Sequence, residues 1–382
     1  MYQAWFDVTH RGALGAAGAF LITFLLIPAL MRVAWKVGLV DRPGGRKMHA
    51  APTPVVGGLA IAIGFIPLAL AIFRPSQPLL GLGAAAAILL PAGIIDDLFN
   101  LKWWWRILAQ AAAALVMIEV GGVKVELIGS ALGLAHHTLG VLSIPFTVIA
   151  TVGLINALNM VDGVDGLAGG LTLAALTMLA AAAIYAGAGG LASGLVMVIG
   201  AGLAFLAFNL RTPFEPRARI FLGNAGSEFL GLLIAWTCFR LTQNPAHPVN
   251  PVLAPFLIAP PLIDCLVLIV QRARQGRSPF SADRNHLHHL LLDAGLTPTG
   301  VVAVIVGASM SLGLAAALAM RAHAPQPLFV VAFLALVAGH FLLTRRRDQA
   351  IVLFGHLAPR RPAGRRAAVP VVHAPLSAGG RH

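Results

Sequence analysis

Residues 156–166 read Asn156-Ala157-Leu158-Asn159-Met160-Val161-Asp162-Gly163-Val164-Asp165-Gly166, and they separate two long apolar runs with polar side chains that a lipid-facing surface would not tolerate. The spacing of three residues within the Asn pair and within the Asp pair brings oxygen ligands and hydrogen-bond donors to one side of a turn. The glycines let the backbone come close to a ligand. This pattern indicates a loop that binds phosphate and a divalent cation, although a polar turn that only caps two helix ends has the same features.

The composition is that of a membrane protein with several spans. Hydrophobic residues make up 58% of the 382 residues, charged residues make up 11%, and the mean hydropathy is +0.84. The formal net charge of +13 is explained more simply by orientation in a bilayer than by nucleic-acid binding, so no nucleic-acid partner is expected. Cys238 and Cys265 lie in apolar runs, which argues against a disulfide framework.

Eleven apolar segments each approach the roughly 20 residues that a helix needs to cross the hydrocarbon core. They cover residues 13–35, 55–73, 79–95, 104–120, 141–158, 167–187, 190–209, 224–242, 251–270, 299–320 and 327–344. Their Leu- and Ala-rich composition lacks strand alternation, so the predicted fold is an all-α polytopic membrane bundle with about 11 transmembrane helices. Residues 1–344 form this domain, and residues 345–382 are predicted to be a basic, disordered tail.

The basic residues decide the predicted orientation. Most of the 27 Lys and Arg residues fall in loops on one side of the predicted membrane and in the C-terminal tail. By the positive-inside rule, the N-terminus is then periplasmic and the tail is cytoplasmic. Most acidic residues lie on the same cytoplasmic side, although acidic residues contribute little to orientation. A cytoplasmic site for an anion and a metal ion accounts for their position.

Two adjacent carboxylates, Asp96 and Asp97, close the third apolar segment. Such a pair at a helix end is electrostatically costly unless a cation or a proton relieves it. We interpret one carboxylate as a metal ligand and the other as a group that takes or holds a proton. The alternative is that both pair with Lys102 and Arg106 in a surface salt network.

Three further stretches carry polar groups on the predicted cytoplasmic side. The loop around Lys47 is basic and glycine-rich, which suits phosphate oxygens and is equally a common topogenic signal. At the start of the eighth segment, Glu228 follows Asn224 by one helical turn on the same face, either to face a shared site or to cap the helix start.

The third stretch, residues 271–297, carries several arginines followed by three histidines, at positions 286, 288 and 289. Because the histidines lack the spacing of a zinc site, this stretch indicates recognition of an anion such as pyrophosphate. Asp264, inside the ninth segment, is either a functional residue or a structural hydrogen-bond partner of a neighbouring helix.

Taken in this order, the clusters resemble the polyprenyl-phosphate N-acetylhexosamine-1-phosphate transferase family. The resemblance spans about residues 36–297 and rests on five motifs. They are Gly38-Leu-Val-Asp41-Arg-Pro, Asp96-Asp97, the stretch from Asn156 to Leu167, Phe221-Leu-Gly-Asn224-Ala-Gly-Ser227, and Ser278-Pro-Phe-Ser-Ala-Asp283-Arg284-Asn-His286-Leu-His288-His289. The last motif is more similar to the branch that uses N-acetylglucosamine than to the muramyl-pentapeptide branch.

The resemblance implies transfer of N-acetylglucosamine 1-phosphate from UDP-N-acetylglucosamine to undecaprenyl phosphate, with release of UMP and a requirement for Mg²⁺ or Mn²⁺. It places the reaction at the cytoplasmic face of a bacterial inner membrane, as the first membrane step of a cell-surface polysaccharide pathway such as that of O-antigen. It also implies an eleven-span bundle, a lipid that enters sideways from the membrane, and a homodimer as an expected assembly. Another UDP-N-acetylhexosamine is left open as the donor.

The motifs assign expected roles to individual residues of this chain. The expected catalytic residues are Asp96, Asp97 and His288. The expected substrate-binding residues are Lys47, Asn156, Asp162, Asp165, Asn209, Arg284, His286 and His289. The expected metal ligands are Asp97, Asn159, Asn224 and Glu228.

Asn224 departs from the family, which normally has a metal-binding Asp at this position. An amide oxygen coordinates magnesium but carries no charge, so the affinity for the metal should fall unless another carboxylate is recruited. Glu228 is the nearest candidate in the sequence, and we hypothesise that it compensates.

Two rival classes are a transporter of an anionic lipid or sugar phosphate and a catalytically impaired relative that only binds such a ligand. The transporter class would need ionisable residues near the bilayer midplane on several broken helices.

Overall fold

The computed structural model describes residues 8–42, 51–129, 131, 138–244, 249–278 and 284–358. The helices are α2 (Ala13–Val37), α3 (Gly57–Ile72), α4 (Gln77–Phe99), α5 (Trp103–Gly121), α6 (Ser143–Val161), α7 (Leu167–Tyr185), α8 (Gly189–Asn209), α9 (Gly223–Thr242), α10 (Ala254–Leu257), α11 (Ala259–Arg274), α12 (Leu287–Asp293), α13 (Pro298–Arg321), α14 (Gln326–Thr344) and α15 (Arg347–Gly355), with short helical turns at Val8–Gly12, Gly140–Leu142 and Pro251–Leu253. Two short strands, β1 (Val40–Asp41) and β2 (Thr53–Pro54), pair antiparallel. The prediction of an all-α membrane bundle is confirmed.

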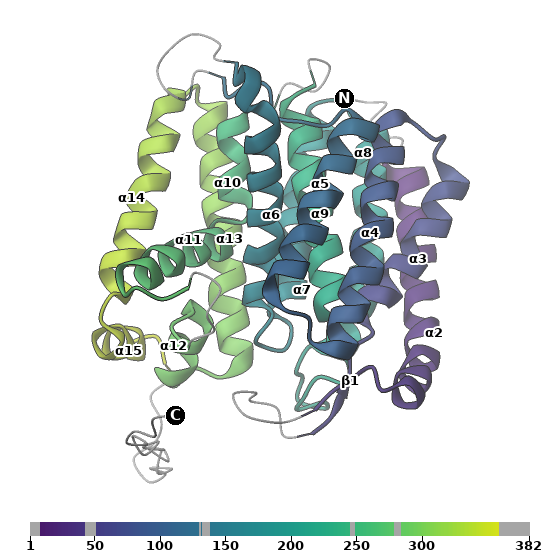
Figure 1. The fold of residues 1–382 in the computed structure, drawn as a ribbon, viewed down its shortest axis with the longest axis horizontal. Coiled ribbons are helices and arrows are strands. Elements are labelled where there is room, and N and C mark those ends of the chain that lie inside the picture. The colour runs from purple at the N-terminus through teal and green to yellow at the C-terminus, as the bar shows by residue number, and fades with distance from the viewer. Residues whose placement is uncertain are drawn as a thin grey trace, which may run out of the picture.

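The long helices stand side by side in one bundle (Figure 1). Within the described residues, eight helices are long and apolar enough to cross a membrane, and the bent pair α10 and α11 makes a ninth if it counts as one span. The two remaining predicted segments correspond to α3, which has 16 residues, and to α9, which carries Glu228 and Arg240. The count of eleven crossings and the orientation therefore stay predictions.

Helix α9 lies inside the bundle, and α14 lies at its edge. Nearly every side chain of α9 is buried, because α3, α4, α6 and α7 pack around it. On α14, by contrast, Leu328, Val331 and Leu334 are exposed. Large apolar side chains on an outer surface are what a lipid environment selects. The polar residues at the start of α9 are thus held at the centre of the assembly.

The ninth predicted segment, residues 251–270, is apolar enough to cross a membrane, but it is a bent pair of helices and not one straight helix. The chain bends by 86° between α10 and α11. Pro260 and Pro261 stand in the first turn of α11. A proline has no N–H to donate to the preceding turn, so the helix that starts at α10 cannot continue through them. Helix α11 consequently lies across the bundle, near the end that holds α12 and α15 (Figure 1).

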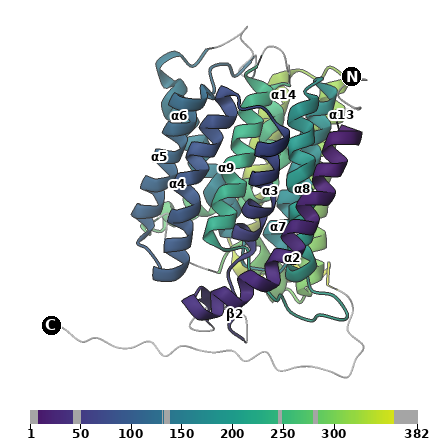
Figure 2. The ribbon, with the colours of Figure 1, turned by 90° about the vertical axis from the view of Figure 1, so that its right-hand side faces the viewer.

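One end of the bundle is tied together by backbone contacts between the loop before α3 and the loop before α9. Phe221 donates its N–H to the carbonyl of Pro54, and Gly57 donates to the carbonyl of Phe221, each at 2.9 Å. Helices α3 and α9 then touch at Gly58 and Gly226. A Cβ added at Gly58 would lie 2.0 Å from the Cα of Gly226, so only glycine allows this approach. Figure 2 shows β2 below the upright helices at this end.

Part of the predicted tail is ordered. The prediction of a disordered segment from residue 345 was wrong for α15, which packs against α12. Arg347 on α15 donates to the carboxylate of Asp293 on α12 and also contacts Arg284 and Asn285. Residues 359–382 lie outside the described part of the chain, as does Lys47.

Candidate active site

The ends of four helices converge on one cluster of polar side chains. Asp96 and Asp97 come from the last turn of α4, Asn159 from the last turn of α6, and Asn224 from the first turn of α9. Arg106, from the first turns of α5, lies among them. Apolar helix faces carry these turns to a common end of the bundle, so residues up to 128 positions apart in the sequence become neighbours.

Asp97 receives hydrogen bonds from the start of α9. Its carboxylate accepts from the backbone N–H of Asn224 at 3.0 Å and of Ala225 at 3.4 Å. The first N–H groups of a helix have no partner within the helix and carry a partial positive charge, so a carboxylate is stabilised there. Gly223 makes the approach possible, because its φ is +78° and an added Cβ would lie 2.7 Å from Asp97 Oδ2.

Asn159 links α6 to the same turn of α9. Its amide nitrogen donates to Asn224 Oδ1 at 2.7 Å and to Ser227 Oγ at 2.8 Å. Three of the four predicted metal ligands, Asp97, Asn159 and Asn224, are therefore brought together. Their role as metal ligands stays a prediction.

Arg106 contacts three members of the polar cluster, although the motifs assign it no role in the site. Its Nη2 donates to Asn159 Oδ1 at 2.6 Å, and its Nε lies 3.4 Å from Asp96 Oδ2 and 3.8 Å from Glu228 Oε1. The alternative of a surface salt network is correct for the pairing of Asp96 with Arg106 but not for its place, since the Arg106 side chain is only 24% exposed and that of Asp96 is 4% exposed. A guanidinium held among several carboxylates and amides is suited to bind phosphate oxygens.

Asp96 and Asp97 point to different partners. While Asp97 faces α9, Asp96 also accepts the backbone N–H of Leu101 at 2.7 Å, which closes the turn between α4 and α5. Asp96 thus orients Arg106 and the start of α5. The two neighbouring carboxylates do not form an equivalent pair.

Glu228 belongs to a buried chain of hydrogen bonds. It is 1% exposed, and its Oε1 accepts from Gln110 Nε2 at 2.8 Å. Gln110 Oε1 in turn accepts from Asn156 Nδ2 at 2.6 Å. In this arrangement Glu228 is a counter-charge of Arg106 one helical turn beyond Asn224. Its role as a compensating metal ligand and the substrate-binding role of Asn156 stay predictions.

The loop between α6 and α7 is braced against the loop before α9. Asp165 accepts from Arg211 Nε at 2.7 Å and from the N–H of Ala218 at 3.2 Å. Asn209, which is buried, accepts from the N–H of Gly166 and donates to the carbonyl of Ile220, each at 2.8 Å. Both predicted substrate-binding residues therefore have protein partners that fix the loop.

Asp162 differs from Asp165 because no described residue forms a hydrogen bond or ion pair with its side chain. Desolvation raises the pKa of its carboxyl to about 7, and the nearby carboxylates of Asp97 and Asp165 add to the shift. A half-buried carboxyl without a cationic partner, next to Asp97, fits a place that a cation or a hydrogen-bonding substrate fills.

The histidines face this loop from α12. An added Cβ at Gly163 would lie 2.6 Å from His288 Nε2, so the ring packs directly on the loop between Asp162 and Asp165. His288 and His289 have ring centroids 4.3 Å apart. Burial, followed by the neighbouring histidines, lowers the pKa of His288 to about 3, and burial also lowers that of His289 to about 4. Both rings are therefore neutral near pH 7, and each has a buried Nδ1 without a hydrogen-bond partner in the described chain.

Arg284 stands at the rim of the site. Its side chain is 48% exposed, and its Nη2 lies 3.4 Å from Asp293 Oδ1. Arg347 contacts the same carboxylate, so α15 helps to position Arg284. This agrees with a rim position for a substrate-binding cation, but the role itself stays a prediction.

The donor set fits a hard divalent cation that binds together with its substrate. No three His, Cys, Asp or Glu side chains in the described residues are arranged to hold a metal ion alone. Mg²⁺ usually takes one or two protein carboxylates and completes its shell with water and substrate phosphate oxygens. One carboxylate from Asp97 and amide oxygens from Asn159 and Asn224 meet that description. Of the further carboxyls, Asp96 and Glu228 lie beside Arg106, while no described cationic side chain pairs with Asp162.

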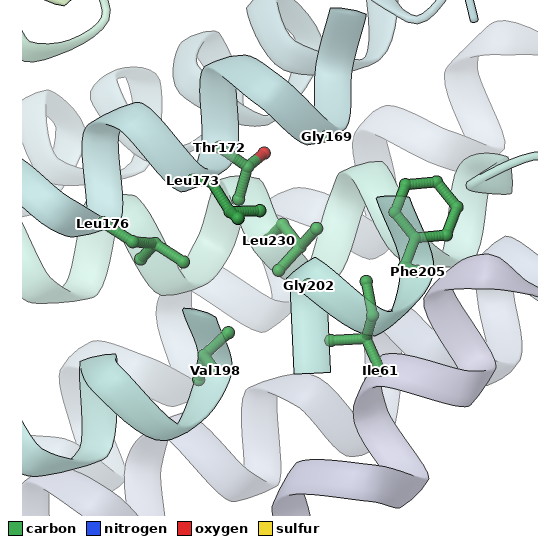
Figure 3. A pocket seen from close by; sticks show the side chains of 9 residues that line it. All are labelled: Ile61, Gly169, Thr172, Leu173, Leu176, Val198, Gly202, Phe205 and Leu230. Atoms are coloured by element: carbon green, nitrogen blue, oxygen red, sulfur yellow. The ribbon is translucent and has the colours of Figure 1, made fainter. Parts of the chain in front are cut away.

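The cavity drawn in Figure 3 lies elsewhere, between α3, α7, α8 and α9. Its lining is apolar except for the hydroxyl of Thr172, and none of the predicted site residues reaches it. Ile61, Leu176 and Phe205 point toward the gap (Figure 3). We interpret it as a packing gap within the bundle and not as a substrate site.

Two residues of the network, Arg106 and Gln110, escaped the sequence-based site assignment. Both lie at one face of α5, four residues apart. A glutamine inside an apolar helix could have indicated a polar partner, because a polar side chain in a membrane costs more free energy than an apolar one.

The fold and the site together define an integral membrane protein whose polar site, at one end of a helical bundle, is built to handle phosphate groups. Residues 79–242 match the glycosyl transferase family 4 pattern. The undecaprenyl-phosphate alpha-N-acetylglucosaminyl 1-phosphate transferase of Escherichia coli (strain K12) is 36% identical over 317 residues, which cover 82% of this chain and 86% of the relative. The enzyme of the same description from Haemophilus influenzae is 38% identical over 73% of this chain and 78% of the relative. The one from Yersinia pestis is 34% identical over 82% of this chain and 87% of the relative. This chain belongs to that family of polyprenyl-phosphate sugar-phosphate transferases.

Proposed function

We propose that this protein transfers N-acetylglucosamine 1-phosphate from UDP-N-acetylglucosamine to undecaprenyl phosphate and releases UMP. The observation that carries the proposal is the convergence of Asp97, Asn159, Asn224, Arg106 and His288 at one end of a membrane bundle. The names of the relatives supply the two substrates. The proposal includes the cytoplasmic face of the bacterial inner membrane as the location, because the positive-inside rule assigns the loops that carry most of the Lys and Arg residues to that face.

In this reaction an oxygen of the lipid phosphate attacks the phosphorus that bears the sugar. A new P–O–P bond forms to the lipid, the P–O bond to the uridine-bearing phosphate breaks, and UMP leaves with the bonding electron pair. Phosphoryl transfer of this kind depends on positioning and on neutralisation of charge more than on covalent help. A carboxyl-phosphate intermediate on Asp96 or Asp97 is the alternative route, and trapping it with labelled substrate distinguishes the two.

The protein groups contribute in distinct ways. Asp97, Asn159 and Asn224 would hold a Mg²⁺ or Mn²⁺ ion, which supplies charge neutralisation on the diphosphate. Arg106 offers guanidinium N–H donors to phosphate oxygens from within the same cluster. The neutral rings of His288 and His289 offer hydrogen bonds without adding charge. The homodimer that the resemblance implies is part of this proposal, and light scattering of the purified protein tests it.

The test is release of UMP by purified protein supplied with UDP-N-acetylglucosamine, undecaprenyl phosphate and Mg²⁺. We expect UMP and the lipid-linked product in equal amounts, and none when either substrate or the metal is omitted. Other UDP-N-acetylhexosamines in the same assay define the donor. Binding of both substrates without UMP would support the impaired relative and contradict the proposed function.

A further inference from the structure

Asp264 stands outside the residues so far placed at the site, yet it contacts the histidine motif directly. The bend before α11 brings this residue beside the start of α12, where it is 5% exposed. Its carboxylate accepts from His286 Nδ1 at 2.9 Å and from the backbone N–H of Leu287, the first residue of α12, at 3.0 Å. One carboxylate therefore holds both the ring of His286 and the backbone from which the other histidines project.

A third bond joins Asp264 to a distant helix. His340 on α14 lies with its Nε2 3.2 Å from Asp264 Oδ1. Helix α14 is fixed beside α11 by a second contact, in which Gln271 donates to Thr344 Oγ1 at 3.2 Å. Thr344 in turn donates to the carbonyl of His340 at 2.8 Å. The position of the carboxylate is thus set by three helices, α11, α12 and α14.

These bonds decide which nitrogen of His286 carries the proton. A carboxylate acceptor at 2.9 Å requires the hydrogen on Nδ1, and the Nη2 of Arg272, 3.5 Å away, is a donor that faces Nε2. The ring plane is then fixed as well. His286 stacks on His288, with centroids 5.5 Å apart and planes 18° apart, and His288 packs on Gly163. The orientation set at Asp264 is passed through this stack to the loop between Asp162 and Asp165.

A role of Asp264 in folding stability alone does not explain why its partners are histidines. Any buried carboxylate needs hydrogen-bond donors, and backbone N–H groups alone would satisfy it. Here two of the three donors are imidazoles, and one of these belongs to the stack that reaches the site. Groups that orient a functional histidine through its second ring nitrogen affect activity by about 10- to 100-fold in metal sites, where this device is best documented.

We propose that Asp264, with His340 as its partner, is a positioning residue for the transfer reaction, which fixes the His286 and His288 rings against the Asp162–Asp165 loop. This inference rests on the proposed function. It predicts that loss of either member of the pair lowers turnover while the rest of the site stays intact.

The experiment compares Asp264→Asn, His340→Leu and His340→Gln with the wild-type protein in UMP release. Asp264→Asn and His340→Leu are expected to lower kcat by about 10- to 100-fold, with KM for UDP-N-acetylglucosamine within about threefold of wild type. Gln places an N–H donor near the position of His Nε2, so His340→Gln should restore most of the kcat. Matched controls are Asp348→Asn and His323→Asn, because both residues are exposed and lie outside the site, and Asn tolerates the positive φ of His323.

Two further measurements separate positioning from folding. Thermal unfolding and UDP-N-acetylglucosamine binding give the folded, competent fraction to which each kcat is normalised. Nitrogen-15 NMR of selectively labelled protein should show His286 with the hydrogen on Nδ1 in the wild type and a mixture of tautomers in Asp264→Asn, since an amide both donates and accepts.

The outcomes are distinguishable. Wild-type protein that releases no UMP contradicts the proposed function, and the NMR comparison then still tests the contact of Asp264 with His286. An active wild type together with unchanged kcat in Asp264→Asn and His340→Leu overturns the inference. So does a loss of kcat that disappears after normalisation to the folded fraction, or a single unchanged His286 tautomer in Asp264→Asn.

Discussion

The carboxylate of Asp97 accepts a hydrogen bond from the backbone N–H of Asn224, which lies 127 residues further along the chain, at 3.0 Å. This bond joins the last turn of α4 to the first turn of α9. The positive end of a helix dipole and a carboxylate therefore share one site. The carboxylate that these N–H groups hold in place is the one that we propose as a ligand of the substrate's counter-ion.

The first prediction concerns Asp97→Asn. The amide has nearly the size of the carboxylate but lacks its charge. Its NH₂ group is a donor and would replace one of the two oxygens that accept from the N–H groups of Asn224 and Ala225. We expect kcat/KM for UMP release to fall by at least about 100-fold, since even outer partners of metal ligands cost 10- to 100-fold. Asp348→Asn, at an exposed position, is the control. Activity within threefold of wild type at all Mg²⁺ concentrations would contradict a role for Asp97 in metal binding.

The second prediction concerns the guanidinium of Arg106, which contacts Asn159, Asp96 and Glu228 together. Arg106→Gln should lower kcat by about 10³-fold, the lower end of the range for arginines that stabilise phosphoryl transfer. Arg106→Lys should fall between Gln and wild type, because an ammonium keeps the charge but not the planar fork of donors. Steady-state UMP release checks the order, and thermal unfolding identifies any loss caused by unpaired carboxylates. Equal activity of the Lys and Gln variants would show that the charge of Arg106 is not used.

The third prediction tests compensation between Asn224 and Glu228. If Glu228 supplies the charge that Asn224 lacks, Glu228→Gln should weaken the apparent affinity for Mn²⁺, and Asn224→Asp should restore it in the double variant. Binding of Mn²⁺ measured by electron paramagnetic resonance gives this affinity without catalysis, and the double-mutant cycle gives the coupling. The hypothesis is dropped if Glu228→Gln is as active as wild type and Asn224→Asp gains nothing.

The sequence was sufficient to predict that the helices and the polar turns share one end of the bundle. The length of an apolar run indicates a helix that crosses the membrane, and the ends of such helices lie at one of the two membrane faces. This is why Asp97, Asn159 and Asn224 were correctly grouped although they come from different segments. The bend at residues 258–261 was missed because the mean hydropathy of 251–270 outweighs the two prolines in a count of apolar residues.

Which partner each polar side chain takes was beyond the sequence. Asp96 and Asp97 are adjacent letters, yet one closes a turn through Leu101 and the other receives the start of α9. Their divergence follows from the helical rotation of about 100° per residue at the end of α4. Asp264 illustrates the same limit, since its bond to His340 depends on how α11 lies across the bundle and on which face α14 presents.

The last prediction is a pH dependence of stability that isolates Asp162. Desolvation raises the pKa of this carboxyl to about 7, from 3.8 as the ordinary value. Because the folded-state pKa is the higher one, the folded protein binds the proton more tightly, so this contribution to stability is full below about pH 4 and is lost as the pH rises through 7. Asp162→Asn removes the titration, and its Tm in detergent with EDTA should therefore rise relative to wild type between pH 5 and pH 8.

His288 and His289, whose pKa values burial lowers to about 3 and 4, act in the opposite direction: they cost stability as the pH falls below about 6.5. Both proteins share them, so their effect cancels in the difference. A Tm difference that stays constant from pH 5 to pH 8 would show that Asp162 ionises as freely in the folded chain as in the unfolded one.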